Sequence, residues 1–217
     1  MNASFSDPIS FSYKKGDNMS KIEELKQEIV DKSLQAFRAG LFAGTSGNMS
    51  TYIPEEELML ITPTSVRYET MKAEQIVEMR LDGTVLSDGK PSSEWHLHAE
   101  MYKANPDVRA VFHTHSPYGT AFAVNHMAIP ATLIEAYFFL GGEIPCAEYA
   151  TPGTPEVGTG AAKTIGDKGG VLLANHGVVA VGKDLSQAYI RAEYIEDAAK
   201  IYTFAKQIGT PVELKHL

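Results

Sequence analysis

The stretch Val111-Phe112-His113-Thr114-His115 places two histidines two residues apart, directly after apolar and β-branched residues. Side chains of an extended strand alternate between its two faces, so residues i and i+2 point the same way. Two imidazoles on one face can reach a single metal ion at the usual distance of about 2.0–2.1 Å. The stretch therefore predicts a buried strand that carries two metal ligands, His113 and His115.

A second pair with the same spacing, His96 and His98, lies in a segment whose composition is typical of a helix, Ser93-Glu94-Trp95-His96-Leu97-His98-Ala99-Glu100. On a helix, residues i and i+2 are about 200° apart, so their side chains cannot share a metal ion. We therefore expect no metal ligand from this second pair.

The best candidate for a third ligand is His176. It follows the apolar run Gly170-Val171-Leu172-Leu173-Ala174, and the apolar pattern resumes after Gly177, so we expect one interrupted strand from residue 171 to 181. Catalytic zinc sites typically use three protein ligands and leave one position open. In the alternative interpretation the histidines are merely buried or solvated, but then His113 and His115 each need a separate partner.

Composition sets limits on the class of protein. The chain has 217 residues, of which 44% are hydrophobic, and a formal charge of −8, which fits a single soluble α/β domain with a full core. The acidic balance, without a cluster of Lys and Arg, argues against nucleic acid as a partner. The apolar runs are strand-sized, so we expect no membrane span.

The expected location of the chain is the cytoplasm. Cys146 is the single cysteine, so no disulfide can form within the chain, and there is no signal-peptide pattern. Residues 1–18 lack periodicity and are predicted to be a disordered extension, followed by one domain over residues 19–217. Within this domain the pattern predicts a short helix over residues 71–79 and a final helix from Leu185 to Ile208.

Three separate clusters of hydroxyl and small residues favour a phosphate site. Glycines in a turn leave backbone N–H groups free to approach an anion, and a helix N-terminus favours negative charge. A nucleotide cofactor is not indicated, because the chain has neither a GxGxxG nor a Walker motif. The clusters are Gly44-Thr45-Ser46-Gly47-Asn48-Met49-Ser50, Ile61-Thr62-Pro63-Thr64-Ser65 and Pro91-Ser92-Ser93-Glu94.

Taken in order, seven motifs between about residues 20 and 209 resemble the class II, zinc-dependent sugar-phosphate aldolases of the fuculose-1-phosphate aldolase type. This superfamily also holds ribulose-phosphate 4-epimerases. The motifs that carry the resemblance are Gly44-Thr45-Ser46-Gly47-Asn48, Ile61-Thr62-Pro63-Thr64, Pro91-Ser92-Ser93-Glu94-Trp95, His113-Thr114-His115, Ile144-Pro145-Cys146-Ala147, Tyr149-Ala150-Thr151 and His176-Gly177.

The resemblance implies a role for each candidate residue. It implies one Zn²⁺ per subunit, or another divalent transition metal, held by His113, His115 and His176, with Glu94 near the metal and acting as the base. The phosphate pocket implied by the family consists of Gly47, Asn48, Thr64, Ser65, Ser92 and Ser93. Ser65 stands where the family often has glycine. The implied fold is an αβα sandwich with a mainly antiparallel sheet, and the implied assembly is a homotetramer with active sites between subunits.

The implied activity is reversible retro-aldol cleavage of a ketose 1-phosphate to dihydroxyacetone phosphate and an aldehyde. The substrate is L-fuculose 1-phosphate or a 5-deoxypentulose or methylthioribulose 1-phosphate. Removal of the proton next to the carbonyl leaves an enediolate, whose charge a zinc ion stabilises as a Lewis acid. Glu94 takes this proton.

Three alternatives remain open. Ser92-Ser93-Glu94 is also an ordinary capping sequence at a helix start. An epimerase or dehydratase on the same scaffold is the second alternative; the epimerases tend to carry Asp where Glu94 stands, whereas dehydratases of methylthioribulose phosphate can keep Glu. The third is a non-catalytic metal-binding protein of cupin type, which expects a glutamate that residues 116–120 do not offer.

The aldehyde half of the expected site departs from the family pattern. The family's tyrosine that protonates the aldehyde oxygen aligns with Ile134 or Glu135, and Tyr137 lies nearby, so Glu135 and Tyr137 are the candidate proton donors. Pro152 replaces an aromatic residue, and the family's C-terminal tyrosine has no counterpart. Lactaldehyde, acetaldehyde, a methylthio-aldehyde and glycolaldehyde therefore remain possible products.

Overall fold

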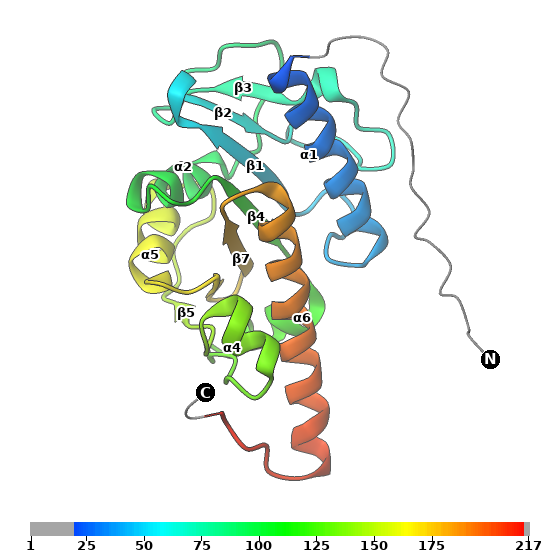
Figure 1. Cartoon of the computed structure of the whole chain (residues 1–217), viewed down its shortest axis with the longest axis vertical. Helices are drawn as coiled ribbons and strands as arrows, with labels where there is room; N and C mark the ends of the chain where they lie inside the picture. Colours follow the sequence, from blue (N-terminus) through cyan, green and yellow to red (C-terminus); the bar gives the residue numbers. More distant parts are fainter. Residues whose placement is uncertain (1–19, 215–217) are drawn as a thin grey trace, which may run out of the picture.

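The computed structural model describes residues 20–214, so the predicted extension over residues 1–18 lies outside the described part (Figure 1). Seven strands and six α-helices follow one another along this part. The strands are β1 (Asn48–Ile53), β2 (Leu58–Ile61), β3 (Val77–Met79), β4 (Ala110–Thr114), β5 (Cys146–Ala147), β6 (Gly170–Leu173) and β7 (Gly177–Gly182). The helices are α1 (Lys21–Arg38), α2 (Trp95–Ala104), α3 (Pro117–Val124), α4 (Ile134–Leu140), α5 (Pro155–Ile165) and α6 (Leu185–Ile208).

All seven strands form one sheet in the order β3-β2-β1-β4-β7-β6-β5. Every neighbouring pair is antiparallel except β5 and β6, which are parallel. The mainly antiparallel sheet implied by the sequence is therefore confirmed. Its central strand, β4, pairs with β1 on one side and β7 on the other, and it carries the first of the predicted ligands.

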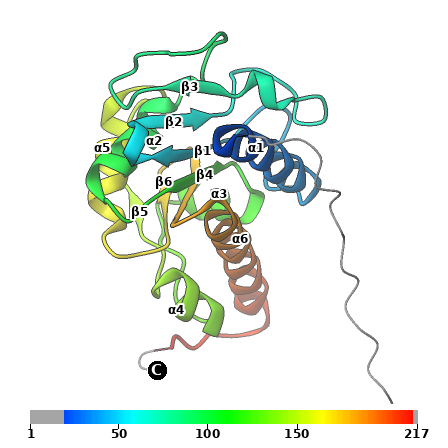
Figure 2. The same ribbon diagram turned by 45° about the horizontal axis from the view of Figure 1, so that its top comes forward.

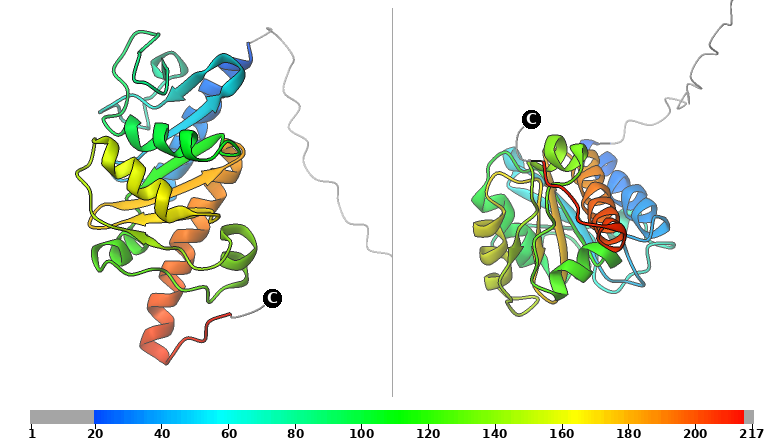
Figure 3. Two further views of the ribbon diagram at one scale, coloured as in Figure 1. Left: turned by 90° about the vertical axis from the view of Figure 1, so that its left-hand side faces the viewer. Right: turned by 90° about the horizontal axis from the view of Figure 1, so that it is seen from below.

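Helices cover both faces of the sheet. Figures 2 and 3 show α2 and α5 on one face and α1 and α6 on the other, with the strands between them. Each face of the sheet has its own hydrophobic core, and neighbouring residues of β4 belong to opposite ones. Val111 packs with residues of α2 and α5, while Phe112 packs with residues of α1 and α6. This arrangement is the predicted αβα sandwich.

Local sequence explains where the two longest helices begin. The Ser20 hydroxyl accepts a hydrogen bond from the Glu23 N–H and caps α1. The Asp184 carboxylate accepts from the Gln187 N–H at 2.7 Å and caps α6. Such caps satisfy donors that a helix start otherwise leaves unpaired. The predicted final helix, from Leu185 to Ile208, is confirmed.

Two expectations about single elements were wrong. The apolar run over residues 171–181 forms two antiparallel strands, β6 and β7, because Asn175 takes a left-handed conformation (φ 55°) and reverses the chain. The segment over residues 71–79 is not one helix but a 3₁₀ turn, Ala73–Gln75, followed by β3. In β3, Val77 and Met79 are buried on one face of the sheet, and burial there outweighs helical propensity.

Between residues 20 and 214, no helix combines the length and the apolar character that crossing a membrane requires.

Candidate active site

Four side chains from three parts of the fold meet at one end of the central strands. His113 and His115 come from the end of β4, His176 from the turn between β6 and β7, and Glu94 from the start of α2. One ligand atom of each lies within 4.8 Å of the ligand atoms of the others. The structure thus brings together the four residues that the sequence singled out, although 82 positions separate the first from the last.

The geometry of this cluster suits a tetrahedral metal ion. Nε2 of His113 lies 3.0 Å from Nε2 of His115 and 3.2 Å from Oε2 of Glu94, and Nε2 of His176 lies 3.0 Å from Oε1 of Glu94. Ligands about 2.0–2.1 Å from a tetrahedral zinc ion are separated by roughly 3.3 Å. These three separations are close to this value, and the other pairs of ligand atoms lie within 4.8 Å.

Hydrogen bonding around the cluster also fits a metal. Nδ1 of His113 is 2.9 Å from the Val178 carbonyl oxygen, which can only accept, so Nδ1 carries a proton and Nε2 is the nitrogen that faces the cluster. Oε1 of Glu94 is buried and faces Nε2 of His176 at 3.0 Å, with no further hydrogen-bond partner among the described residues. A cation between the rings would satisfy both atoms, so these residues fit a divalent metal.

The surroundings of Glu94 and His115 lower the pKa of both groups. Burial alone would raise the pKa of the Glu94 carboxyl, but the charges of His113 and His176 and hydrogen bonds from both outweigh it and hold the pKa well below its usual range. Burial, together with the neighbouring imidazoles of His113 and His176, lowers the pKa of His115 to about 4. Near neutral pH, Glu94 is therefore an anion and His115 a neutral ligand.

A polar pocket of about 250 Å³ opens beside the cluster. All six residues predicted for the phosphate pocket line it, and Glu94 and His115 form its inner wall. Its lining is rich in hydroxyl groups and contains no Lys or Arg from the described residues. The lining residues are Thr45, Ser46, Gly47, Asn48, Pro63, Thr64, Ser65, Ser92, Ser93, Glu94 and His115.

Backbone contacts bring the three polar segments to this pocket. The Ser92 N–H donates to the Thr62 carbonyl at 3.0 Å, and the Thr64 N–H donates to the Lys90 carbonyl at 3.0 Å. The third segment requires glycine, because Gly47 has a φ of 89° and a Cβ there would lie 2.9 Å from the carbonyl oxygen of His113. The pocket and the metal cluster therefore share the backbone of β1 and β4.

The capping alternative for Glu94 does not account for its carboxylate. Glu94 occupies the N-cap position of α2, but its side chain makes no capping hydrogen bond. Instead, Ser92 accepts a hydrogen bond from the Glu94 N–H at 3.3 Å, and the carboxylate faces His113 and His176.

The two candidate proton donors are not part of this site. Glu135 and Tyr137 lie on α4, and neither belongs to the metal cluster or lines the adjoining pocket in the described part of the chain. Helix α4 packs against α6 instead.

Sequence reasoning missed a set of buried polar residues behind Glu94. His98, rejected as a metal ligand, is fully buried and contacts Asn48 and Ser50. His96, two residues before His98, stacks on Trp95 outside the cluster. One signal was available in the sequence: Glu94 and His98 are four residues apart at the start of a helix, which puts them on one face.

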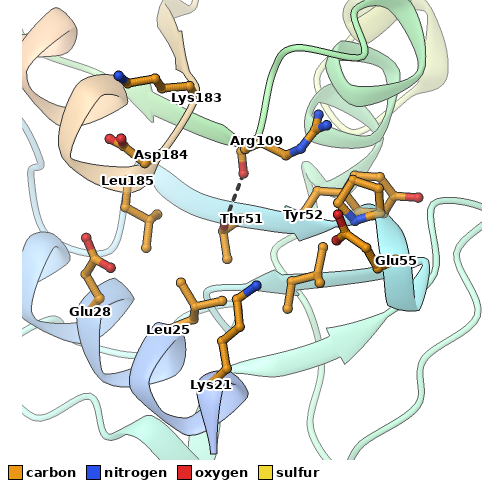
Figure 4. Close-up of a pocket in the computed structure, with 12 residues that line it drawn as sticks. Lys21, Leu25, Glu28, Thr51, Tyr52, Glu55, Arg109, Lys183, Asp184 and Leu185 are labelled. Carbon is orange, nitrogen blue, oxygen red and sulfur yellow. Dashed lines mark hydrogen bonds between the residues drawn. The ribbon is translucent and has the colours of Figure 1, made fainter.

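A second hollow, of about 260 Å³, lies near the other end of β1 and takes no part in this chemistry (Figure 4). There the Thr51 hydroxyl donates to the Arg109 carbonyl at 2.9 Å. Acidic and basic side chains line it in equal number, so no net charge selects an anion. These side chains are Lys21, Arg109, Lys183, Glu28, Glu55 and Asp184.

Comparisons with known proteins agree with this geometry. Over 193 residues the chain is 37% identical to 5-deoxy-D-ribulose 1-phosphate aldolase of Bacillus thuringiensis serovar kurstaki, covering 88% of this chain and 89% of the relative. It is also 37% identical to L-ribulose-5-phosphate 4-epimerase of Salmonella paratyphi C over 202 residues, covering 87% and 88%. A solved L-fuculose 1-phosphate aldolase superposes with a TM-score of 0.86 at 36% identity, covering 90% of this chain and 92% of that one.

The model of the family described as "Class II Aldolase and Adducin N-terminal domain" matches residues 27–203, a range that includes every residue of the metal cluster and its adjoining pocket. With this match, the chain belongs to the class II aldolase family.

Proposed function

We propose that the chain is a zinc-dependent aldolase that reversibly cleaves a ketose 1-phosphate to dihydroxyacetone phosphate and a small aldehyde. The observation that carries the proposal is the position of the Glu94 carboxylate between the imidazoles of His113 and His176 and a hydroxyl-lined pocket. The aldolases of Bacillus thuringiensis and the solved L-fuculose 1-phosphate aldolase, which are similar over most of their length, support it.

His113, His115 and His176 would hold the zinc ion, with Glu94 beside them. When bound there, zinc supplies a Lewis acid that stabilises negative charge on substrate oxygens. Gly47, Asn48, Thr64, Ser65, Ser92 and Ser93 bind the phosphate through backbone N–H and hydroxyl groups. Their binding energy holds the ketose in register with Glu94.

Glu94 is the proposed base. In the synthetic direction Glu94 removes a proton from the hydroxylated carbon next to the carbonyl of dihydroxyacetone phosphate. This carbon then bonds to the aldehyde carbon, and the aldehyde oxygen takes a proton from the donor on that side. In the cleavage direction the same hydroxyl gives its proton back to that group, the carbon–carbon bond breaks with its electron pair on the dihydroxyacetone phosphate fragment, and protonated Glu94 delivers its proton to that carbon. Its burial beside polar neighbours keeps the carboxylate in one position for both directions.

A homotetramer would complete the aldehyde side of the site. Helix α4 stands apart from the pocket of its own chain, so Glu135 or Tyr137 could act as proton donor only on the substrate of a neighbouring subunit. Exposed apolar side chains on and near α3, α4 and the second half of α6 offer a surface for such contacts. These are Val124, Met127, Ile134, Phe138, Phe139, Ile201, Phe204, Ile208 and Val212.

The site would act on a sugar phosphate in the cytoplasm. The single cysteine of the sequence agrees with a reducing compartment. L-Fuculose 1-phosphate and the 5-deoxypentulose and methylthioribulose 1-phosphates share the phosphorylated end that the pocket would bind, and they differ at the aldehyde end.

Incubation of the zinc-loaded protein with each of these ketose 1-phosphates, followed by an enzymatic assay for dihydroxyacetone phosphate, tests the activity. An aldolase releases dihydroxyacetone phosphate, whereas an epimerase or a dehydratase does not. The epimerase is the second candidate because the Salmonella relative is 37% identical. Conversion of substrate without any dihydroxyacetone phosphate would replace the aldolase proposal with one of these two reactions.

Metal analysis of two variants tests the roles of the residues. We expect His113→Ala to lose zinc and activity together, because His113 is a fully buried ligand at the centre of the cluster. We expect Glu94→Gln to keep most of its zinc and to lose turnover by about 10²-fold or more, because the base is gone. An active Glu94→Gln enzyme would exclude Glu94 as the base.

A further inference from the structure

A buried row of polar side chains extends from Glu94 into the layer between α2 and β1. Asn48 Nδ2 lies 3.0 Å from Oε2 of Glu94, and Asn48 Oδ1 is hydrogen-bonded to Nε2 of His98. Ser50 Oγ lies 2.6 Å from Nδ1 of His98 and 2.6 Å from the Tyr102 hydroxyl. All five residues are buried, with at most 9% of the residue exposed, so water competes little for these bonds.

The direction of every hydrogen bond in this row follows from its first member. An ionised carboxylate only accepts, so the Asn48 amide must point its N–H₂ group at Glu94 and its oxygen at His98. The amide oxygen also only accepts, so Nε2 of His98 carries a proton. A neutral imidazole has one donor and one acceptor, so Nδ1 accepts from Ser50, and Ser50 in turn accepts from Tyr102. The row has a single consistent order.

We propose that Tyr102, Ser50 and His98 form a one-directional hydrogen-bond chain that fixes the amide orientation of Asn48, and that His98 is thereby a positioning residue for the Glu94 carboxylate. The inference rests on the proposed role of Glu94 as the base. It assigns a role to a histidine that does not reach the metal cluster.

The chain distinguishes the two oxygens of Glu94. Oε2 receives the N–H bond from Asn48, whereas Oε1 has no contact with the row and faces Nε2 of His176 at 3.0 Å. The row therefore anchors the carboxylate at one oxygen and leaves the other directed toward the cluster. Without the anchor, the Asn48 amide could rotate by 180° and turn its oxygen toward the carboxylate, which would repel Glu94 from its position.

The fold explains why these residues can form the chain. His98 and Tyr102 follow Glu94 at intervals of four residues, so all three lie on the face of α2 that is turned to the sheet. Asn48 and Ser50 are two residues apart on β1, so both side chains point to that same face. The chain thus locks the start of α2 to β1 next to the metal cluster.

Without any aldehyde present, NMR can follow the exchange of the C–H proton of dihydroxyacetone phosphate for deuterium from D₂O. This exchange reports only the removal of that proton, the step assigned to Glu94. The test compares zinc-loaded wild type, His98→Met, His98→Gln and the control His96→Gln. We expect His98→Met to slow exchange at saturating substrate by about tenfold or more, with an unchanged KM, because a small displacement of a base costs this much. His98→Gln keeps an amide donor for Asn48 and should recover to within about threefold of wild type.

The control His96→Gln should match wild type, since His96 lies on the same helix outside the chain. A normal exchange rate per folded, zinc-loaded His98→Met molecule would overturn the proposal, and so would an equal loss in His98→Gln. If Glu94→Gln also exchanged normally, the proposed base would be wrong; normal exchange in His98→Met alone would overturn only the positioning role.

A second measurement does not depend on turnover. In protein with ¹⁵N-labelled histidine, stripped of metal, the ring shifts of His98 should report a proton on Nε2 and none on Nδ1. Ser50→Ala removes the donor to Nδ1 and should move that nitrogen's resonance while leaving Nε2 protonated. A proton on Nδ1 of His98 in the wild type would reverse the order of the chain and contradict the proposal, even if a variant failed to fold.

Discussion

Gly177 lies directly against the backbone of Thr114: a Cβ at position 177 would come within 2.4 Å of the Thr114 carbonyl oxygen. This added Cβ would also be 3.0 Å from the His115 ring and 3.2 Å from the His113 ring. The glycine at the start of β7 therefore allows β4 to bring both histidines to the metal cluster. No larger residue fits there unless the two strands move apart.

Gly177→Ala should therefore weaken zinc binding by about tenfold or more, because the ligands on β4 must shift. Competition with a chromophoric chelator measures the affinity. The matched control is Gly160→Ala in α5, where a Cβ meets nothing within 4 Å, and we expect unchanged affinity and about 1 kcal/mol of added helix stability. Equal zinc affinity in both variants would mean that the contact with Thr114 does not position the ligands.

The sequence predicted which residues gather in the cluster better than it predicted the contacts around them. On a strand, the spacing of His113 and His115 places both side chains on the same face, and the apolar, β-branched residues before them indicate a strand. The clusters of hydroxyl residues likewise predicted the pocket, because glycine and serine at strand ends and helix starts bind anions in a local way. Each of these signals lies within a few residues of chain.

The remaining features depend on contacts between distant segments. Strand β1 pairs with β4, about 60 residues away, and no local pattern specifies that pairing. The turn at Asn175 could not be predicted, because two fully buried antiparallel strands have the same apolar composition as one long strand. The role of His98 could not be predicted from the sequence, because the spacing of metal ligands does not reveal a histidine on a helix that is hydrogen-bonded to side chains of a strand.

Ser65 offers a test of backbone strain. Its φ is 59°, a left-handed conformation that costs a non-glycine residue roughly 1 kcal/mol. We expect Ser65→Gly to raise the free energy of unfolding by about 0.5–1 kcal/mol, measured by chemical denaturation.

Ser65→Ala is the control for this variant, since it also removes the hydroxyl group but keeps the strained backbone. It should not gain stability, while both variants should raise KM for the ketose phosphate to a similar extent if the hydroxyl binds phosphate. A stabilised Ser65→Ala protein would show that the hydroxyl, rather than the backbone conformation, is the source of the cost.

Lys26 ties α1 to the edge of the sheet. Its ammonium group lies 2.7 Å from Glu78 of β3 and 3.0 Å from Glu23, and the residue is 8% exposed. Lys26→Ala leaves the Glu78 carboxylate without its cation and removes a buried aliphatic stem, so we expect a loss of about 2–3 kcal/mol in the free energy of unfolding.

Lys72→Ala provides the comparison for Lys26, because Lys72 also faces a glutamate, Glu74, at 3.8 Å but with its side chain 71% exposed. An exposed pair of this kind contributes less than about 1 kcal/mol. Urea denaturation of both variants should give clearly different losses. Equal, small losses would mean that the buried pair contributes no more than a surface pair.

Complete burial lowers the pKa of His98 from 6.5 in the unfolded chain to about 3 in the fold. Below pH 6.5 the unfolded state binds a proton that folded His98 does not, so this residue's contribution to stability is present above pH 6.5 and is lost as the pH falls toward 3. Between pH 7 and pH 5 the loss amounts to about 2 kcal/mol. Chemical denaturation at both pH values, with chelator present to remove metal effects, should show that wild type loses about 2 kcal/mol more than His98→Gln, which has no ring to protonate. Parallel losses in the two proteins would mean that His98 binds a proton equally well in the folded and unfolded states, contrary to its burial.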